Sequence, residues 1–232
     1  MATQILALDC ATESCSVALW LDGKIESRYQ LAPQQQRNYL LPMVSQLLAE
    51  AGLTLNALDT LAVTRGPGSF TGVRLGLGVV QGLAFGVDRP VISISTLEVL
   101  AQGAYRLTGA TSVIAALDAR LQQIYWGAYR RLEERWQLIA PEALLTAAQA
   151  ADFLARYRDS WAPVGSGWSL EPQLVSAISS SAVGEVMLHC PQAQDLLPLA
   201  AAAWERGEGV PAAQVAPCYL RHQVAFKPNL VK

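Results

Sequence analysis

The stretch that most constrains the fold is residues 65–86, which reads RGPGSFTGVRLGLGVVQGLAFG. Its first eight residues hold three glycines and one proline around Ser69, Phe70 and Thr71, a composition typical of a tight turn that leads into a helix. We therefore expect a glycine-rich loop followed by a helix over residues 71–86.

That helix is apolar around its whole circumference, because only Arg74 and Gln81 are polar between residues 72 and 86. A surface helix normally keeps one polar face. Each interior glycine costs about 0.5 to 1 kcal/mol relative to alanine, so close approach by another backbone is expected in compensation. One flank would lie on the chain's own sheet and the other on a second helix, of this chain or of another molecule. The glycines concerned are Gly72, Gly76, Gly78, Gly82 and Gly86.

The first half of the chain has the pattern of an α/β unit that starts with an antiparallel meander. Apolar runs at residues 4–8 and 15–20 are followed by Asp22-Gly23, a strong hairpin signal, and by a third run at 25–31. Helical spacing predicts helices over 37–51 and from 96 to about 106, with strands at 60–64 and 91–94. Strands that alternate with helices indicate parallel pairing through crossover connections.

A second strand-and-Asp element resembles the start of the chain. Asp118 follows the apolar run 113–117 as Asp9 follows 4–8, and the run 124–129 corresponds to 15–20. Such a repeat predicts a duplicated two-lobed fold with one Asp-bearing turn per lobe at a central cleft, with a chance match as the alternative. At one constant, ungapped offset the matched pairs are Leu8-Asp9 with Leu117-Asp118, Ala18 with Gly127, and Trp20 with Tyr129.

The signal is weaker beyond residue 129. We expect a helix over 146–157, a strand at 161–164, a turn at 165–167 and a helix over 195–206, with a surface loop at 176–182 and a frayed tail from residue 227. No linker divides the chain into independent domains. The predicted division is an N-terminal lobe of residues 1–106 and a reduced C-terminal lobe of residues 107–232.

Composition and motifs exclude several kinds of chemistry. The formal net charge is −2 and no basic run occurs, so we do not expect this subunit alone to grip a polyanion. The two histidines and four cysteines show no metal-binding spacing, and Ser69 has no neighbouring histidine for nucleophilic catalysis. Neither catalytic nor metal residues are therefore predicted.

Two features keep an anion or metal alternative open. The glycine loop is neither a P-loop nor GxGxxG, but it still presents N–H groups at a helix start, where an anion is favoured. Asp9 and Asp118 could hold Mg²⁺ or orient a water in a cleft, as carboxylates do in phosphoryl transfer. We favour turn capping for both, because no lysine or second acid stands beside them.

The N-terminal residues MATQILALD lack the basic region, apolar core and cleavage site of a signal peptide. Residues 65–86 are too interrupted by glycine to cross a lipid bilayer. We expect a cytoplasmic protein without a membrane partner.

Four segments together resemble the bacterial TsaB (YeaZ) family: ILALDCATESCSVAL, RGPGSFTGVRLGLGVVQGLA, ALDARLQQIYWG and PCYLR. They span nearly the whole chain, and RGPGSFTGVR is the most specific of them. The resemblance implies an α/β fold of the actin/Hsp70/sugar-kinase type, duplicated into two lobes. It also implies a non-catalytic subunit of the tRNA threonylcarbamoyladenosine system, whose catalytic subunit is TsaD.

The same resemblance implies partners and a surface. Family members pair with TsaD through helices, are joined by the ATPase TsaE, form homodimers when alone, and meet tRNA only through the complex. The complex moves threonylcarbamoyl onto N6 of the adenosine beside the anticodon of tRNAs that read ANN codons. The helices would be residues 37–51 and 71–86, with contacts from Leu40, Leu41, Val44, Leu47, Leu48, Val73, Arg74, Leu77, Val80 and Gln81.

Two departures from the family pattern weaken any catalytic role. The catalytic relative has HxxxH on the helix that matches 37–51, where this chain has no histidine, and many relatives keep one histidine where Gln36 stands. The DAR turn is followed here by Leu121-Gln122-Gln123 and not by a small residue and an acid. No cofactor is predicted, apart from an ATP or ADP at the subunit contact as an open alternative. The rival function is a stand-alone actin-like ATPase or sugar kinase that uses Asp9 and Asp118.

Overall fold

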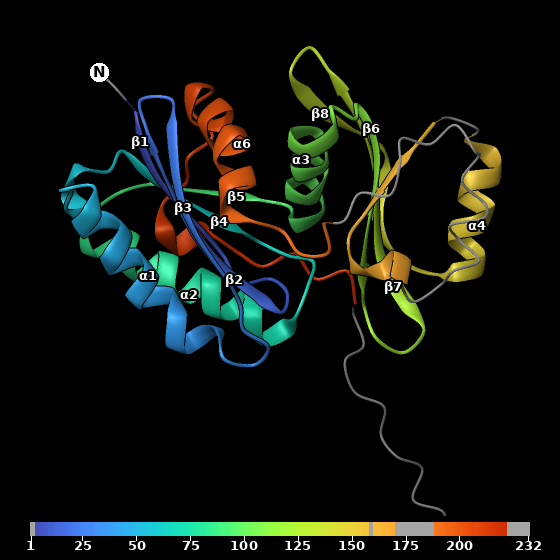
Figure 1. Ribbon diagram of the computed structural model, residues 1–232, viewed down its shortest axis with the longest axis horizontal. Coiled ribbons are helices and arrows are strands. Elements are labelled where there is room, and N and C mark those ends of the chain that lie inside the picture. Colours follow the sequence, from blue (N-terminus) through green and yellow to red (C-terminus); the bar gives the residue numbers. More distant parts are fainter. Residues whose placement is uncertain (1–2, 158–159, 170–187, 222–232) are drawn as a thin grey trace, which may run out of the picture.

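The computed structural model describes residues 3–157, 160–169 and 188–221. They form two β-sheets, and helix α3 (Thr96–Thr108) lies between them (Figure 1). Each sheet carries its own apolar clusters on both faces. The sheets therefore define two lobes.

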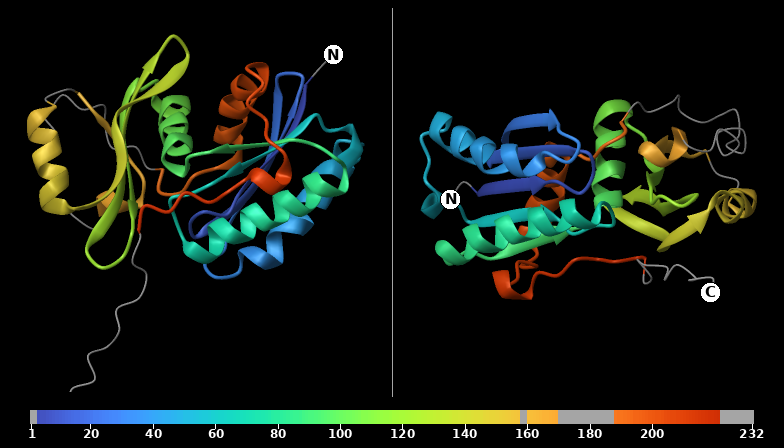
Figure 2. Two further views of the ribbon diagram at one scale, coloured as in Figure 1. Left: turned by 180° about the vertical axis from the view of Figure 1, so that it is seen from behind. Right: turned by 90° about the horizontal axis from the view of Figure 1, so that it is seen from below.

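The first lobe has five strands in the order β3-β2-β1-β4-β5, with β1 antiparallel to β2 and parallel to β4. Alternation along β1 sends Leu6 and Leu8 toward α1 and α2, and Ile5 and Ala7 toward α6. Figure 2 shows α1 and α2 side by side on one face. The elements are β1 (Gln4–Asp9), β2 (Ser14–Leu21), β3 (Lys24–Leu31), α1 (Gln36–Glu50), the 3-10 turn η1 (Leu55–Ala57), β4 (Thr60–Thr64), α2 (Phe70–Gly86), β5 (Val91–Ile94), α6 (Ala193–Glu205) and the 3-10 turn η3 (Ala212–Gln214).

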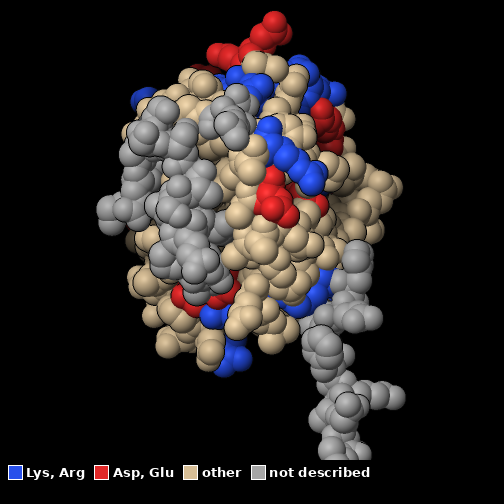
Figure 3. Space-filling model, turned by 90° about the vertical axis from the view of Figure 1, so that its right-hand side faces the viewer, with Lys and Arg blue, Asp and Glu red and all other residues tan. Residues whose placement is uncertain are grey.

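The second lobe has four strands in the order β8-β7-β6-β9. Helix α3 covers one face, and α4 and η2 cover the other through a cluster around Trp126. On the outer side, where α4 lies, charged side chains of both signs are scattered among uncharged atoms (Figure 3). The elements are β6 (Ser112–Asp118), β7 (Gln123–Leu132), β8 (Arg135–Thr146), α4 (Ala147–Arg156), β9 (Ala162–Val164) and the 3-10 turn η2 (Ser166–Ser169).

The two lobes repeat one topology, which confirms the predicted duplicated two-lobed α/β fold. In each, a strand that ends in Asp pairs antiparallel with the next strand and parallel with a later one, as β1 does with β2 and β4, and β6 with β7 and β9. The ungapped match is wrong beyond the turn. Asp9 is opposite Ser16 but Asp118 is opposite Ile124, so the second turn is one residue shorter. The structural counterpart of Ala18 is therefore Trp126, and that of Trp20 is Ala128.

The remaining predicted helices and strands are present, with ends shifted by a few residues. The hairpin turn at Asp22 and Gly23 has positive φ at both residues, as the Asp-Gly signal requires. Strand β8 was not predicted. None of its residues is fully buried and it contains Pro141, so it lacks the alternation of a half-buried strand. The expected loop at 176–182 and the tail from 227 lie outside the described residues.

Two helices cross the predicted boundary between the lobes. Helix α6, which follows residue 107 in the chain, packs on the first sheet through Leu196, Leu197 and Ala200. Helix α3 packs on the second sheet through Leu97 and Leu100. The division at residue 106 as a domain boundary stays a prediction.

Candidate functional site

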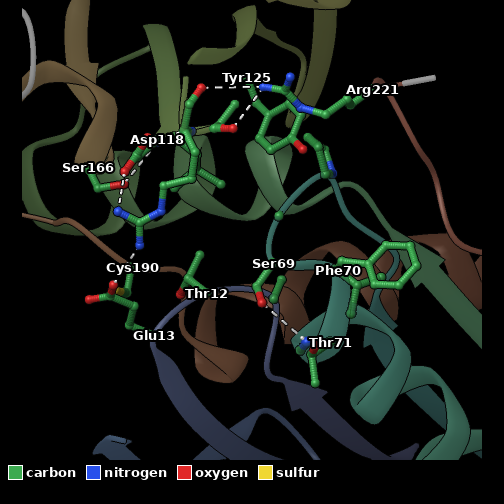
Figure 4. A pocket seen from close by; sticks show the side chains of 18 of the residues that line it. Thr12, Glu13, Ser69, Phe70, Thr71, Asp118, Tyr125, Ser166, Cys190 and Arg221 are labelled. Atoms are coloured by element: carbon green, nitrogen blue, oxygen red, sulfur yellow. Dashed lines mark hydrogen bonds and ion pairs between the residues drawn. The ribbon is translucent and has the colours of Figure 1, made fainter. Parts of the chain in front are cut away.

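A cavity of about 930 Å³ lies between the lobes. Its first-lobe wall is formed by the turn after β1 and by the glycine loop before α2. Its second-lobe wall is formed by the loop after β6. Figure 4 shows Thr12, Ser69 and Phe70 on one side and Asp118, Tyr125 and Arg221 on the other. The cavity is the cleft that the two-lobed prediction places between the Asp-bearing turns.

Asp9 ends β1 beneath this cleft and is fully buried. Its Oδ1 accepts hydrogen bonds from the Ala11 amide at 3.3 Å and the Thr64 hydroxyl at 2.6 Å. Its Oδ2 has no partner among the described residues. Burial raises the pKa of Asp9 to about 7, against the lowering effect of these two hydrogen bonds. The side chain caps its own turn and does not line the cavity.

Asp118 ends β6 at the opposite wall and caps its turn in the same way, since Oδ1 accepts from the Arg120 amide at 2.6 Å. Its Oδ2 pairs with the Arg120 guanidinium at 2.9 Å, and that guanidinium reaches Glu13 of the first lobe at 3.3 Å. The dashed lines of Figure 4 follow this bridge across the cleft. Both Asp residues therefore have the capping role that the sequence favours, through Oδ1 in each case.

The glycine loop is explained by close packing on the turn after β1. A Cβ at Gly68 would overlap the carbonyl oxygen of Ala11, and one at Gly72 that of Cys10. The Ser69 amide donates to Ala11 O at 2.7 Å, and its hydroxyl caps α2 by accepting from the Gly72 amide at 3.4 Å. Only glycine allows the helix start to lie this close to β1.

Most of the predicted contact residues are buried by this chain itself, and their part in a partner contact stays a prediction. Helix α2 is apolar on all sides because the sheet, α1 and residues 210–215 together cover three of its flanks. Gln81, half-buried, donates to Ala212 O at 3.2 Å and Val215 O at 3.0 Å. Only Leu41 and Arg74 of the predicted set are exposed. The buried members are Leu40, Val44, Leu47, Leu48, Val73, Leu77 and Val80, all at most 7% exposed.

The open side of α2, which we call the outer face, consists of Phe70, Arg74, Gly78, Gly82 and Phe85. Arg74 was a predicted contact, and Gly78 and Gly82 were predicted places of close approach, whereas Phe70 and Phe85 were not predicted. No described atom lies within 4 Å of a Cβ built at Gly78 or Gly82, and Phe85 is 83% exposed. The recurrence of residues 70, 74, 78 and 82 at steps of four could have identified it. Tyr39 and Leu41 expose further apolar area on neighbouring α1.

The described residues contain no cluster of three or more histidine, cysteine, aspartate or glutamate side chains arranged to hold a metal ion. Within the same residues, no helix is both long and apolar enough to span a membrane.

The fold and the cleft place the chain among duplicated two-lobed α/β proteins. A family model for TsaD, tRNA N6-adenosine threonylcarbamoyltransferase, matches residues 30–190. The tRNA threonylcarbamoyladenosine biosynthesis protein TsaB of Escherichia coli K12 is 43% identical over 97% of both chains, and that of Haemophilus influenzae is 39% identical over 96% of this chain and 95% of its own. The solved structure of YeaZ from Pseudomonas aeruginosa is 44% identical with a TM-score of 0.83, and covers 94% of this chain and 100% of its own.

The chain belongs to the TsaB family, and its residues 30–190 to the wider family of the TsaD model. The predicted family is confirmed.

Proposed function

We propose that this chain is a non-catalytic subunit in tRNA threonylcarbamoyladenosine biosynthesis, which binds TsaD and supports transfer of the threonylcarbamoyl group by that partner. The observation that carries the proposal is similarity to curated TsaB proteins over nearly the full length of both chains. Cytoplasmic location follows from the tRNA substrate.

The non-catalytic role is supported by the state of the cleft. Asp9 is sealed beneath it, while Asp118, Arg120 and Glu13 bind one another across it. A group that acts on a substrate must be within hydrogen-bond reach of it. Here Asp9 is buried out of reach of the cleft, and Asp118 and Glu13 at its walls pair with the Arg120 guanidinium.

The outer face of α2 supports a helix-mediated contact with TsaD. Glycines without neighbours allow a second backbone to approach closely, and Phe70 and Phe85 flank them as apolar anchors. The exposed Leu41 on α1 extends the surface. Contiguous exposed apolar area of this kind often marks a protein–protein contact. The proposal also includes a homodimer through the same face in the absence of TsaD and binding of TsaE to the pair. It includes no cofactor, and a nucleotide at the contact is the alternative that the measurement with and without ATP decides.

The test is Gly82→Leu, combined with mixing with TsaD and mass measurement by light scattering, with and without ATP. The Cβ of the new side chain meets no described atom within 4 Å, and leucine replaces a poor helix former, so we expect the isolated protein to stay folded. At a close helix contact it blocks approach, and we expect the affinity for TsaD to fall at least about tenfold.

Ala148→Leu, on the exposed side of α4 in the second lobe, is the matched control and should bind as the wild-type protein does. If Gly82→Leu bound TsaD with wild-type affinity, the outer face of α2 would not be part of the contact. Absence of any wild-type complex with TsaD, with or without ATP, would overturn the proposed function.

A further inference from the structure

The C-terminal residues 215–221 leave the first lobe beside α2 and run toward the second lobe (Figure 2). Val215 lies in the first-lobe core, and its carbonyl accepts from Gln81 of α2 at 3.0 Å. The Cys218 amide donates to Arg65 O at 2.8 Å, at the start of the glycine loop. A Cβ at Gly66 would lie 2.8 Å from the Cys218 carbonyl oxygen, so this stretch packs directly on the loop.

Tyr219 fixes the segment to the first turn of α2. Its hydroxyl accepts from Arg74 Nε at 2.7 Å, and its ring stacks on Phe70 with centroids 5.8 Å apart. The Arg74 guanidinium lies 3.5 Å from the centroid of the Phe70 ring, a cation–π contact. Phe70 and Arg74 also belong to the outer face of α2.

Arg221 fixes the other end of the segment to the second lobe. Its guanidinium donates to Ala119 O at 2.9 Å and Arg120 O at 3.4 Å, in the loop after β6. That loop carries left-handed φ at Arg120, Leu121 and Gln122, of 62°, 55° and 57°. Such a conformation is costly for side chains of this kind and persists only when surrounding contacts hold it.

Among the described residues, the other bond from this loop to the first lobe is the Arg120–Glu13 ion pair, whose side chains are 76% and 61% exposed. An exposed pair of this kind contributes little. Arg221 is therefore the principal side-chain tie between the loop and the segment packed on α2.

We propose that residues 215–221 form a clasp, which fixes the loop 118–123 against the first turn of α2 and so sets the opening of the cleft. A partner seated on Phe70 and Arg74 displaces or tightens the clasp, so partner binding and cleft opening are coupled. This second statement rests on the proposed function and the first does not. Because coupling is reciprocal, opening the cleft also changes the affinity for the partner.

The chain carries its own probes of the cleft. Cys190 and Cys218 line the cavity and are half-buried, whereas Cys10 and Cys15 are fully buried. In a Cys218→Ser background, the rate at which Cys190 reacts with 5,5′-dithiobis(2-nitrobenzoate) is the readout of cleft opening. We expect Arg221→Ala to raise that rate about tenfold, since two hydrogen bonds that hold the closed position are lost.

Arg206→Ala is the matched control. Arg206 also donates to a backbone carbonyl, Ala202 O at 2.8 Å, but within the first lobe, and its loss should leave the Cys190 rate unchanged. If Cys10 and Cys15 also react in Arg221→Ala, that variant has unfolded globally. Arg221→Lys, which keeps the charge, then decides, and we expect it to raise the Cys190 rate about threefold. An unchanged Cys190 rate in a folded variant would overturn the clasp.

The coupling is tested by adding TsaD. We expect saturation with TsaD to change the Cys190 rate of the Cys218→Ser protein, and this change to disappear in Arg221→Ala. Binding of TsaD without such a change would overturn the coupling alone. If TsaD does not bind, the proposed function fails, while the rates of the isolated protein still decide the clasp.

Discussion

The turn after β1 and the turn after β6 have the same design but opposite environments. In both, an Asp ends the first strand of a sheet and accepts the amide two residues later. Asp9 is fully buried, and a pKa raised to about 7 accompanies that burial. The Asp118 side chain is 17% exposed and pairs with a mostly exposed arginine.

The difference comes from the element that comes after the parallel strand in each lobe. After β4, a glycine loop brings the long helix α2 directly onto the first turn. After β9, a glycine turn brings the short η2 onto β6, with its own contact to Asp118 through Ser166. A duplicated strand-and-turn motif therefore acquires its electrostatics from the element that covers it.

The largest expected effect concerns the buried carboxyl group of Asp9. The pKa of Asp9 is higher in the folded protein, so the folded state holds its proton over about pH 4 to 7 and the unfolded state does not. The contribution of Asp9 to stability is thus complete below pH 4 and lost as pH rises to 7. Between pH 4 and pH 8, the free energy of unfolding of Asp9→Asn should rise relative to that of the wild type by of the order of 4 kcal/mol.

Urea denaturation at a series of pH values measures this gain. Glu98, whose pKa burial also raises to about 7 with help from nearby Glu142, keeps a slope of the same sign in both proteins. Glu13→Gln, at an exposed carboxylate of the same turn, controls for removal of a negative charge. Parallel curves for Asp9→Asn and wild type would show that Asp9 stays ionised when folded.

The second test compares how closely the start of α2 packs on Cys10 with how closely Gly167 of η2 packs on Ala116 of β6. At Gly72 an added Cβ would overlap the Cys10 carbonyl oxygen, and helix α2 would have to lift from the sheet. At Gly167 the nearest atoms, of Ala116, are 3.0 and 3.1 Å away. We expect Gly72→Ala to lower the free energy of unfolding by about 3 kcal/mol and Gly167→Ala by about 1 kcal/mol.

Thermal and urea unfolding of the two alanine variants give the comparison directly. Gly78→Ala is the control for helix propensity, since its Cβ meets no described atom and alanine should stabilise the protein slightly. Equal losses at Gly72 and Gly167 would contradict the closer packing of Gly72 on Cys10 than of Gly167 on Ala116.

The third test removes the hydroxyl that supports each turn. The Thr64 hydroxyl donates to buried Asp9, and the Ser166 hydroxyl accepts from the Asp118 amide at 3.2 Å. At pH 8, Thr64→Val should cost about 2 kcal/mol because it removes a donor from a buried carboxylate, and Ser166→Ala about 1 kcal/mol. The difference should narrow at pH 5, where Asp9 is protonated. A larger loss of stability for Ser166→Ala than for Thr64→Val would contradict the expectation that the hydroxyl beside Asp9 contributes more than the one beside Asp118.

Local patterns were sufficient for much of this fold. The alternation of apolar runs, the Asp22-Gly23 turn and the recurrence of strand, Asp and turn predict the strands of both lobes up to residue 129 and their duplication. The sequence also indicates the cleft between Asp9 and Asp118, since the turns of two repeated units face each other. These features depend on residues close together in the chain.

The features that could not be predicted depend on distant segments. The apolar circumference of α2 indicates that it is covered, but Val215, from more than a hundred residues away, covers one flank, and this changes which residues remain exposed. Arg221 reaches the loop after β6 from the C-terminal segment for the same reason. Strand β8 lies half-exposed along its length, so burial leaves no period in its sequence.

The smallest expected effect is at the ion pair across the cleft. Arg120→Gln removes the contacts to Asp118 and Glu13, yet the arginine is 76% exposed and the amide of residue 120 still reaches Asp118. Because exposed pairs are screened by water and salt, we expect a loss below about 0.5 kcal/mol that vanishes at 1 M salt. Denaturation at low and high salt checks this, with Arg28→Gln, which breaks the Arg28–Glu50 pair within the first lobe, as control. A loss of several kcal/mol at low salt that disappears at 1 M salt would mean that the second turn is held electrostatically, whereas the first is held by burial.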